Sequence, residues 1–152
     1  MISFRKACAD DVAAIVSLLA DDMLGQQRED ASTPTNPSYL KAFAAIDQDP
    51  NQLLAVAELD GMIAGCLQLT FVPGLSRLGA WRGQIESVRV SSSHRGIGLG
   101  QALLEWAIER CRARGCRLVQ LTTDKNRPDA RRFYENLGFA ASHDGMKLTI
   151  PD

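Results

Sequence analysis

A predicted strand, a glycine-rich turn and a long helix follow one another in the middle of this sequence. The pattern of Gln84–Val90 predicts a strand, Ser91–His94 a short polar connection, and Arg95–Gln101 contains three alternating glycines. A glycine-rich turn that enters a helix leaves backbone N–H groups unpaired at the positive end of the helix dipole. Such a turn suits phosphate. The stretch therefore predicts a phosphate-bearing ligand at the helix that starts near Gly98.

Two common nucleotide motifs do not fit this turn. A Walker-type loop needs Lys before Ser or Thr after its last glycine, whereas Gln101-Ala102 follows Gly100. A dinucleotide fingerprint needs the spacing G-x-G-x-x-G, whereas the three glycines here are spaced by two throughout. The remaining pattern is R-x-x-G-x-G, formed by Arg95, Gly98 and Gly100.

Composition narrows the class of protein. The 152 residues, 45% hydrophobic and 23% charged, fit one globular domain over residues 1–152. A net charge of −1 gives no bulk attraction to nucleic acid or to an acidic membrane. No apolar run approaches the ~20 residues of a membrane helix, and the first residues lack the apolar core of a signal peptide. We therefore expect neither a nucleic acid nor a membrane as partner.

Cysteine usage indicates the compartment. The four cysteines Cys8, Cys66, Cys111 and Cys116 include no C-x-x-C pair and fall inside predicted strands and helices. Free thiols of this kind are typical of a reducing compartment. We expect a cytoplasmic protein without a metal site.

The order of the predicted elements indicates an α/β fold with a mixed sheet. It implies a mostly antiparallel sheet of about seven strands flanked by four helices, with one parallel strand–helix–strand unit from Gln84 to Thr122. Residues Gly25–Thr35 and Pro73–Arg82 are predicted as loops. The predicted strands are Ile2–Arg5, Gln52–Leu59, Met62–Phe71, Gln84–Val90, Arg117–Thr122 and a closing hairpin of Phe139–Ala141 with Met146–Ile150. The predicted helices begin at Asp10 or Asp11, at Asn36-Pro37, after Gly98 and at Pro128.

Two motifs in this order resemble those of the GNAT superfamily of N-acetyltransferases. Val88–Gln101 is similar to the acyl-CoA pyrophosphate loop of that family. Asp129–Phe139 is similar to its A-x-x-x-Y-x-x-x-G-F signature, with Tyr134 at the tyrosine position. The resemblance covers nearly the whole chain. It implies the GNAT fold and direct transfer of an acetyl group from acetyl-CoA to an amine.

The resemblance also implies roles for individual residues. Tyr134 would be the general acid toward the leaving thiolate, and Glu86 the general base, often acting through water. The backbone of Val88–Val90, including Arg89, would pair with the pantetheine arm. The position where the family often has a CoA-contacting Asn is held here by Arg127, with Asn126 directly before it. The pyrophosphate would bind the N–H groups of Arg95, Gly96, Ile97, Gly98, Leu99, Gly100 and Gln101.

The chemistry asks for such groups in any case, because an amine must lose a proton before it attacks a thioester, and a thiolate leaves more easily beside a weak acid. Simpler interpretations remain open for both residues. Glu86 is alternatively a strand residue in a salt bridge with Arg89 or Arg82, and Tyr134 is alternatively a core aromatic beside Phe133. In a regular strand Glu86 shares a face with Val88, and a bulge would change this.

The sequence defines the acceptor of the acetyl group less well than it defines the acetyl-CoA site. Thr123–Arg127 and Ser142-His143 resemble a subgroup that includes aminoalkylphosphonate N-acetyltransferases, which favours a small-molecule amine. The alternatives are a protein N-terminus or lysine as acceptor, and a regulatory module that binds CoA without catalysis. Substrate contacts of His143 and Trp81 stay open. Homodimers are common for this fold, and no residue pattern specifies one.

Overall fold

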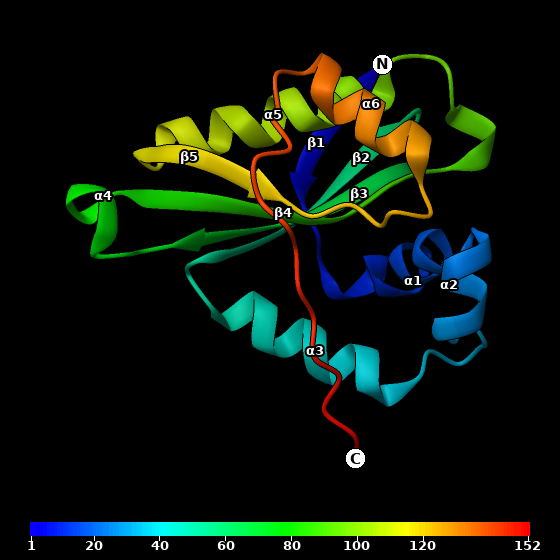
Figure 1. The fold of residues 1–152 in the computed structure, drawn as a ribbon. Coiled ribbons are helices and arrows are strands. Elements are labelled where there is room, and N and C mark those ends of the chain that lie inside the picture. Colours follow the sequence, from blue (N-terminus) through cyan, green and yellow to red (C-terminus); the bar gives the residue numbers. More distant parts are fainter.

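A computed structural model describes residues 1–152 and contains one five-stranded sheet with the order β1-β2-β3-β4-β5 (Figure 1). The first four strands are antiparallel, and β5 runs parallel to β4. The strands are β1 (Ile2–Lys6), β2 (Gln52–Leu59), β3 (Met62–Val72), β4 (Trp81–Val90) and β5 (Cys116–Leu121). The expected α/β fold with its mixed sheet and its parallel strand–helix–strand unit is therefore confirmed.

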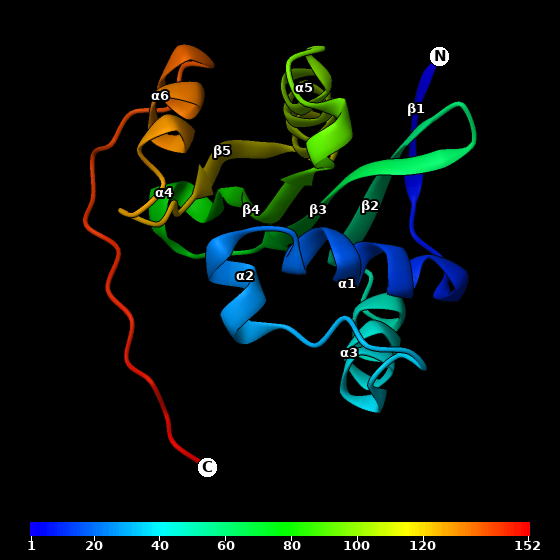
Figure 2. The ribbon, with the colours of Figure 1, turned by 90° about the vertical axis from the view of Figure 1, so that its right-hand side faces the viewer.

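Helices cover both faces of the sheet (Figure 2). The first face carries α1 (Val12–Ala20), α2 (Met23–Arg28) and α3 (Pro37–Gln48), and the second carries α5 (Leu99–Ala113) and α6 (Pro128–Asn136). The short α4 (Ser76–Gly79) is a left-handed turn, since Arg77 and Leu78 have φ of 56° and 60°. No helix of the chain is both long and apolar enough to span a bilayer.

Each face of the sheet has its own hydrophobic core, because successive strand residues point to opposite faces. Under α5, Leu67 and Leu69 of β3 pack with Leu103. On the other face, Cys66 of the same strand packs with Ile15 of α1. The helix after Gly98 is the largest contributor to the first core and holds the glycine-rich turn against the sheet.

Two predicted loops were wrong in part. Residues Met23–Arg28 form α2, because Asp22 caps this short helix by accepting a hydrogen bond from the Gly25 N–H at 2.6 Å. Strand β4 begins at Trp81, inside the predicted loop. With α2 and the turn α4, the structure has more helical segments than the expected four.

The expected closing hairpin is also wrong, and the sheet has five strands instead of about seven. Residues 140–152 are exposed and form no strand. Figures 1 and 2 show this segment running past β5 and away from the body. A strand pattern becomes a strand only where a neighbouring strand supplies hydrogen bonds, and this segment meets none within its own chain.

Candidate functional site

Strand β4 contains a bulge that decides which way its side chains point. Ser87 has φ of 56°, and the pairing with β3 shifts there, so that Glu86 lies opposite Gln68 and Arg89 opposite Cys66. The extra residue places Glu86 and Arg89 on the α1 face of the sheet. Val88, in contrast, packs on the core under α5. The side chains of Glu86 and Val88 therefore point to opposite faces of the sheet.

Strands β4 and β5 separate beyond the bulge. They pair only from Trp81 to Ile85 on β4, so the backbone of Glu86–Val90 has no neighbouring strand on this edge. An extended chain that enters this gap could add to β4 as a strand does.

The glycine-rich turn lies at the end of this gap. Gly96 and Gly98 have φ of 81° and 82°, a conformation that side chains with a Cβ rarely adopt. The first hydrogen bond of α5 joins the Ala102 N–H to the Gly98 carbonyl at 3.1 Å. The backbone N–H groups from Arg95 to Gln101 donate no hydrogen bond in the structure. They form a row of free donors at the positive end of a 15-residue helix.

Glu86 carries an exposed carboxylate that makes neither an ion pair nor a hydrogen bond in the structure. The alternative of a salt bridge with Arg89 or Arg82 is not formed. Arg89 instead donates from Nη1 to the Val88 carbonyl at 2.8 Å, and its buried Nε has no partner. The unpaired carboxylate of Glu86 and the guanidinium of Arg89, whose Nε has no hydrogen-bond partner, thus lie on the same face of β4.

Tyr134 is half-buried on α6 and packs edge-on against Phe133 and Phe139, with ring centroids 5.3 and 5.9 Å away. Phe133 and Tyr134 are both partly buried, and both pack against the core under α5. The Tyr134 hydroxyl makes no hydrogen bond in the structure. Burial raises the pKa of this phenol, against the positive charges of Arg89 and Arg127, so the hydroxyl keeps its proton at neutral pH.

An ion pair that the sequence did not predict joins α2 to α6. Arg127 caps α6 and lies with Nη1 2.5 Å from the Asp22 carboxylate. Burial opposes ionisation of Asp22, but the Gly25 N–H and the charges of Arg127 and Arg89 hold its pKa below the usual value. Asn126, next to Arg127, is exposed, and its N–H donates to Asp124 at 2.8 Å.

Trp81 and His143, whose substrate contacts the sequence left open, lie away from Glu86 and Tyr134. Trp81 stands at the start of β4, opposite Cys116, and packs on the core far from the bulge. His143 lies in the exposed segment 140–152, 2.8 Å from the Ser142 hydroxyl. The structure brings neither of them to Glu86 or Tyr134.

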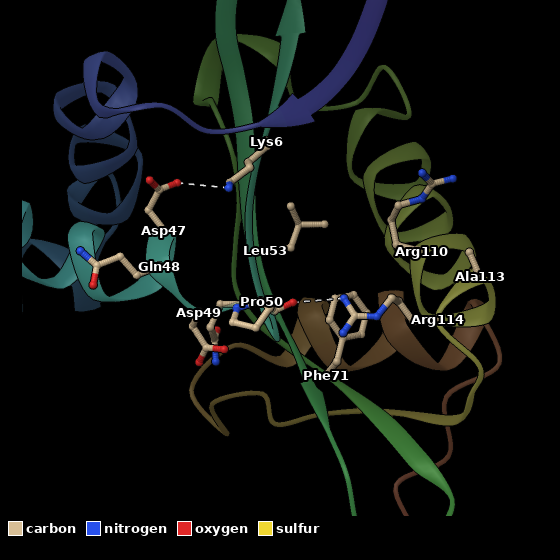
Figure 3. Close-up of a pocket in the computed structure, with 11 residues that line it drawn as sticks. Lys6, Asp47, Gln48, Asp49, Pro50, Leu53, Phe71, Arg110, Ala113 and Arg114 are labelled. Atoms are coloured by element: carbon tan, nitrogen blue, oxygen red, sulfur yellow. Dashed lines mark hydrogen bonds and ion pairs between the residues drawn. The ribbon is translucent and has the colours of Figure 1, made fainter.

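Two cavities flank the sheet. The larger, about 560 Å³, lies where α5 ends and is lined by Lys6, Asp47, Phe71, Arg110 and Arg114 among others (Figure 3). No predicted site residue lines it, and α5 separates it from the glycine-rich turn by about 20 Å. The smaller, about 170 Å³, lies between α1, α3 and the sheet and reaches Cys66, Gln68 and Ser87 beside the bulge. We found no cluster of His, Cys, Asp and Glu that could hold a metal ion.

Comparisons with known proteins match this fold. Residues 14–139 match the model of the Acetyltransferase (GNAT) family. The chain is 30% identical over 139 residues to the aminoalkylphosphonate N-acetyltransferase of Salmonella typhimurium, covering 91% of this chain and 85% of that protein. It is 41% identical over 91 residues to the glucosamine 6-phosphate N-acetyltransferase of Trypanosoma brucei brucei, covering 59% of each. The crystal structure of a transcriptional regulator from Bacillus halodurans C-125 superposes with a TM-score of 0.96 at 50% identity, covering 99% of this chain and 100% of that chain.

Proposed function

The chain belongs to the acetyltransferase (GNAT) family and is an N-acetyltransferase, and we propose that it transfers the acetyl group of acetyl-CoA directly to a primary amine of a small molecule. The observation that carries this proposal is the row of free N–H groups from Arg95 to Gln101. These groups would bind the pyrophosphate of CoA. The pantetheine arm would enter the gap between β4 and β5 and pair with Val88–Val90. Free thiols on all four cysteines support action in the cytoplasm.

The acyl transfer needs a base and an acid, and we assign them to Glu86 and Tyr134. The unpaired Glu86 carboxylate would take a proton from the ammonium group of the acceptor, directly or through water. The amine nitrogen would then form a bond to the thioester carbon, with the oxyanion held by a backbone N–H near Val88. As the carbon–sulfur bond breaks, the Tyr134 hydroxyl would give its proton to the thiolate. The second proton of the attacking nitrogen would restore the tyrosine, and Glu86 would release the first proton to water. The products are an N-acetyl amine and CoA.

A matched pair of glycine substitutions tests the cofactor site. Gly98→Ala forces a Cβ onto a residue with φ of 82°, and Gly61→Ala does the same at φ of 81° in the hairpin between β2 and β3. Both positions have open space around the new methyl group. We expect only Gly98→Ala to weaken acetyl-CoA binding, by about tenfold in Kd measured by titration calorimetry, since about 1 kcal/mol of strain distorts the turn. Equal losses in both variants, or no acetyl-CoA binding by the wild type, would contradict the proposed site.

A second pair of variants tests the assigned roles. Tyr134→Phe and Glu86→Gln should each lower kcat by about 100-fold, because each removes one proton transfer, while the Kd of acetyl-CoA stays within a factor of two or so. Glu105→Gln, on the exposed face of α5, serves as the control for a lost surface carboxylate. Release of CoA is followed by its free thiol. A parallel loss of binding and turnover in Tyr134→Phe would instead indicate a packing role.

For the acceptor, we propose an amine that carries a phosphonate or phosphate group. The two curated relatives described above are named for acceptors with a phosphorus oxyanion. In this chain, the half-buried Arg89 and the neighbouring Arg127 face a single carboxylate, that of Asp22. The cluster thus has surplus positive charge beside the bulge, and the unpartnered Nε–H of Arg89 would donate a hydrogen bond to the oxyanion.

A screen of acceptors with Arg89→Gln tests this assignment. Wild-type enzyme should acetylate aminophosphonates and amino sugar phosphates faster than matched amines without the anion, and faster than peptide N-termini or lysine side chains. Arg89→Gln should raise KM at least tenfold for the phosphorylated amines and little for the others, since one charge-assisted contact is lost. The Kd of acetyl-CoA is the control for the cofactor site. Equal KM changes for both groups of amines would contradict the assignment.

A regulatory role is a second candidate, favoured by the 50% identity to a protein described as a transcriptional regulator. In that case acetyl-CoA binding itself would be the signal. The variants Glu86→Gln and Tyr134→Phe separate the two, because a regulatory function would survive both while acetyl transfer would not.

A further inference from the structure

The smaller cavity beside the sheet, here called the bulge cavity, is mainly apolar, and its polar end lies at the bulge of β4. Ten of its twelve lining residues are hydrophobic, among them Leu19 of α1 and Phe43 of α3. The other two are Ser87, which carries the bulge, and Gln68, which lies opposite Glu86 on the neighbouring strand. The cavity therefore has an apolar interior, and its polar end lies beside the proposed base.

Helix α3 covers this cavity without filling it. Helix α1 has four buried residues, whereas the 12-residue α3 has none. Phe43 and Ile46 of α3 line the bulge cavity and stay half-buried, although their spacing is that of a helix face turned toward a core. Side chains that border an open space lose the contacts that a packed core supplies. An apolar group bound between α1 and α3 would restore these contacts.

The size of the bulge cavity indicates what it can hold. Its volume is about 170 Å³, and an apolar cavity of about 150 Å³ in a protein interior takes up benzene. A phenyl ring or a branched alkyl group therefore fits. A sugar ring of similar size does not suit these walls, because its hydroxyl groups would lose their hydrogen bonds to water and find few partners. Size and polarity thus favour an apolar group.

The bulge cavity lies next to the two residues to which we assigned the amine and the anion of the acceptor. Cys66 and Gln68 both line it and lie two residues apart on one face of β3, about 7 Å along the strand. Arg89 lies opposite Cys66, and Glu86 lies opposite Gln68. The guanidinium, the carboxylate and the cavity therefore surround one region of the α1 face. An acceptor in this region can have its nitrogen at Glu86, its anion at Arg89 and a side chain in the cavity.

We propose that the bulge cavity binds an apolar side chain on the α-carbon of the acceptor, so that the acceptor is a primary amine whose α-carbon carries an anion and a side chain of benzyl or isobutyl size. The inference rests on the proposed acetyl transfer, which places the nitrogen at Glu86 and the anion at Arg89. Both 1-aminoalkylphosphonates and α-amino acids have these three groups on one carbon. Three separate contacts distinguish mirror images, so the enzyme acetylates one enantiomer.

A series of 1-aminoalkylphosphonates with hydrogen, methyl, isobutyl and benzyl side chains tests the cavity. We expect kcat/KM to rise along the series and to be about 30-fold higher for one benzyl enantiomer than for aminomethylphosphonate, because the apolar group leaves water. Phenylalanine and leucine form a second arm, and faster acetylation in one arm identifies the anion that the enzyme uses. Equal kcat/KM for all side chains, or a fall with side-chain size in both arms, would overturn the proposal.

Equilibrium binding separates a failure of this inference from a failure of the acetyl transfer. Titration calorimetry in the presence of CoA should show the benzyl compound binding about tenfold more tightly than aminomethylphosphonate, or better. Tighter binding without any acetylation would contradict the transfer alone. Acetylation of aminomethylphosphonate without tighter binding of the benzyl compound would contradict the cavity alone.

Three substitutions on α3 locate the effect. Ala42 lines the bulge cavity, and Ala44 is an exposed residue on the opposite side of the helix. Ala42→Leu fills part of the cavity and should lower kcat/KM about tenfold for the benzyl compound, while aminomethylphosphonate changes by about twofold or less. Ala44→Leu is the control and should change neither, and far-UV circular dichroism checks that each variant folds. Ile46→Ala enlarges the cavity and should shift the preference toward a naphthyl side chain. Equal losses for both compounds in Ala42→Leu, or an unchanged preference in Ile46→Ala, would overturn the proposal.

Discussion

Among individual residues, Asp11 is the one charged side chain that the fold buries, at 7% exposure. Its carboxylate accepts from Arg5 Nη1 and Nη2 at 2.7 and 2.9 Å and from the Cys8 N–H at 2.8 Å. The hydrogen bonds from Arg5 outweigh burial and hold the pKa of Asp11 well below its ordinary value. The pair fixes the end of β1 to the start of α1. This ion pair stabilises the fold because Arg5 and the Cys8 N–H together satisfy the hydrogen-bonding capacity of the Asp11 carboxylate.

We expect Asp11→Asn to lower the free energy of unfolding at pH 7 by about 2 kcal/mol, since it weakens charge-assisted hydrogen bonds of a buried group. The folded pKa lies below the unfolded value of about 3.9. Wild-type Asp11 therefore stabilises fully above that value and loses its contribution as the pH falls through the folded pKa. Urea unfolding at several pH values should show the gap between the two proteins closing in acid. Asp10→Asn, at an exposed neighbour, is the control and should change little.

The phenol of Tyr134 gives a second prediction for a single residue. Burial disfavours the phenolate, so the pKa of Tyr134 lies above the ordinary value of about 10. The chain has two tyrosines, and Tyr39→Phe leaves Tyr134 as the only one. Absorbance at the tyrosinate band should then titrate with a midpoint above that of free tyrosine. A midpoint at the ordinary value would mean that the hydroxyl is open to water.

At the level of elements, the contact of α5 with β4 leaves no room for a side chain at Gly83. A Cβ there would lie 2.3 Å from the Cys111 Sγ and 3.4 Å from its Cβ. Glycine at this position lets the helix that follows the glycine-rich turn lie directly on the strand that carries Glu86. Cys111 of α5 is thus in close contact with β4.

Gly83→Ala should lower the free energy of unfolding by about 2 kcal/mol through overpacking. Adding Cys111→Ala removes the clashing sulfur, and the new methyl group fills part of its space. We therefore expect the double variant to be more stable than Gly83→Ala alone, with a coupling of about 1 kcal/mol measured in a double-mutant cycle. Additive losses would show that the two positions do not meet.

At the scale of the whole molecule, two buried cysteines, one in each core, can show whether the two cores open together. Cys66 belongs to the core under α1 and Cys111 to the core under α5, and burial raises the pKa of each thiol to about 12. A thiol of this kind reacts only when the structure opens. If residues 1–152 unfold as one domain, as their composition predicts, both thiols open together.

We therefore expect a thiol reagent at pH 8 to label the exposed Cys8 at once and to label Cys66 and Cys111 at one common, much slower rate. Mass spectrometry of peptides separates the sites. The common rate should rise with urea as the free energy of unfolding falls. Different rates for Cys66 and Cys111 would show that the two cores open separately.

The sequence by itself determined the local parts of this protein. The turn at Gly96–Gly98, the cap Asn36 with its following proline, and the hairpin at Asp60-Gly61 all depend on residues adjacent in the chain, and the structure has each of them. The α/β sheet followed from the order of these parts, and the family followed from the resemblance of Val88–Gln101 and Asp129–Phe139 to its motifs. Both are confirmed. Hydrophobic periodicity and helix capping are properties of short segments, so they can be recognised in the sequence alone.

Only the tertiary structure decided how these parts meet. The bulge at Ser87 put Glu86 and Val88 on opposite faces, which regular alternation would have kept together. The ion pair of Asp22 with Arg127 and the contact of Gly83 with Cys111 join residues far apart in the chain. The alternation of Met146–Ile150 predicted a strand, yet this segment pairs with no strand in the structure. Long-range pairing decides these features, because their energy comes from neighbours that local sequence does not identify.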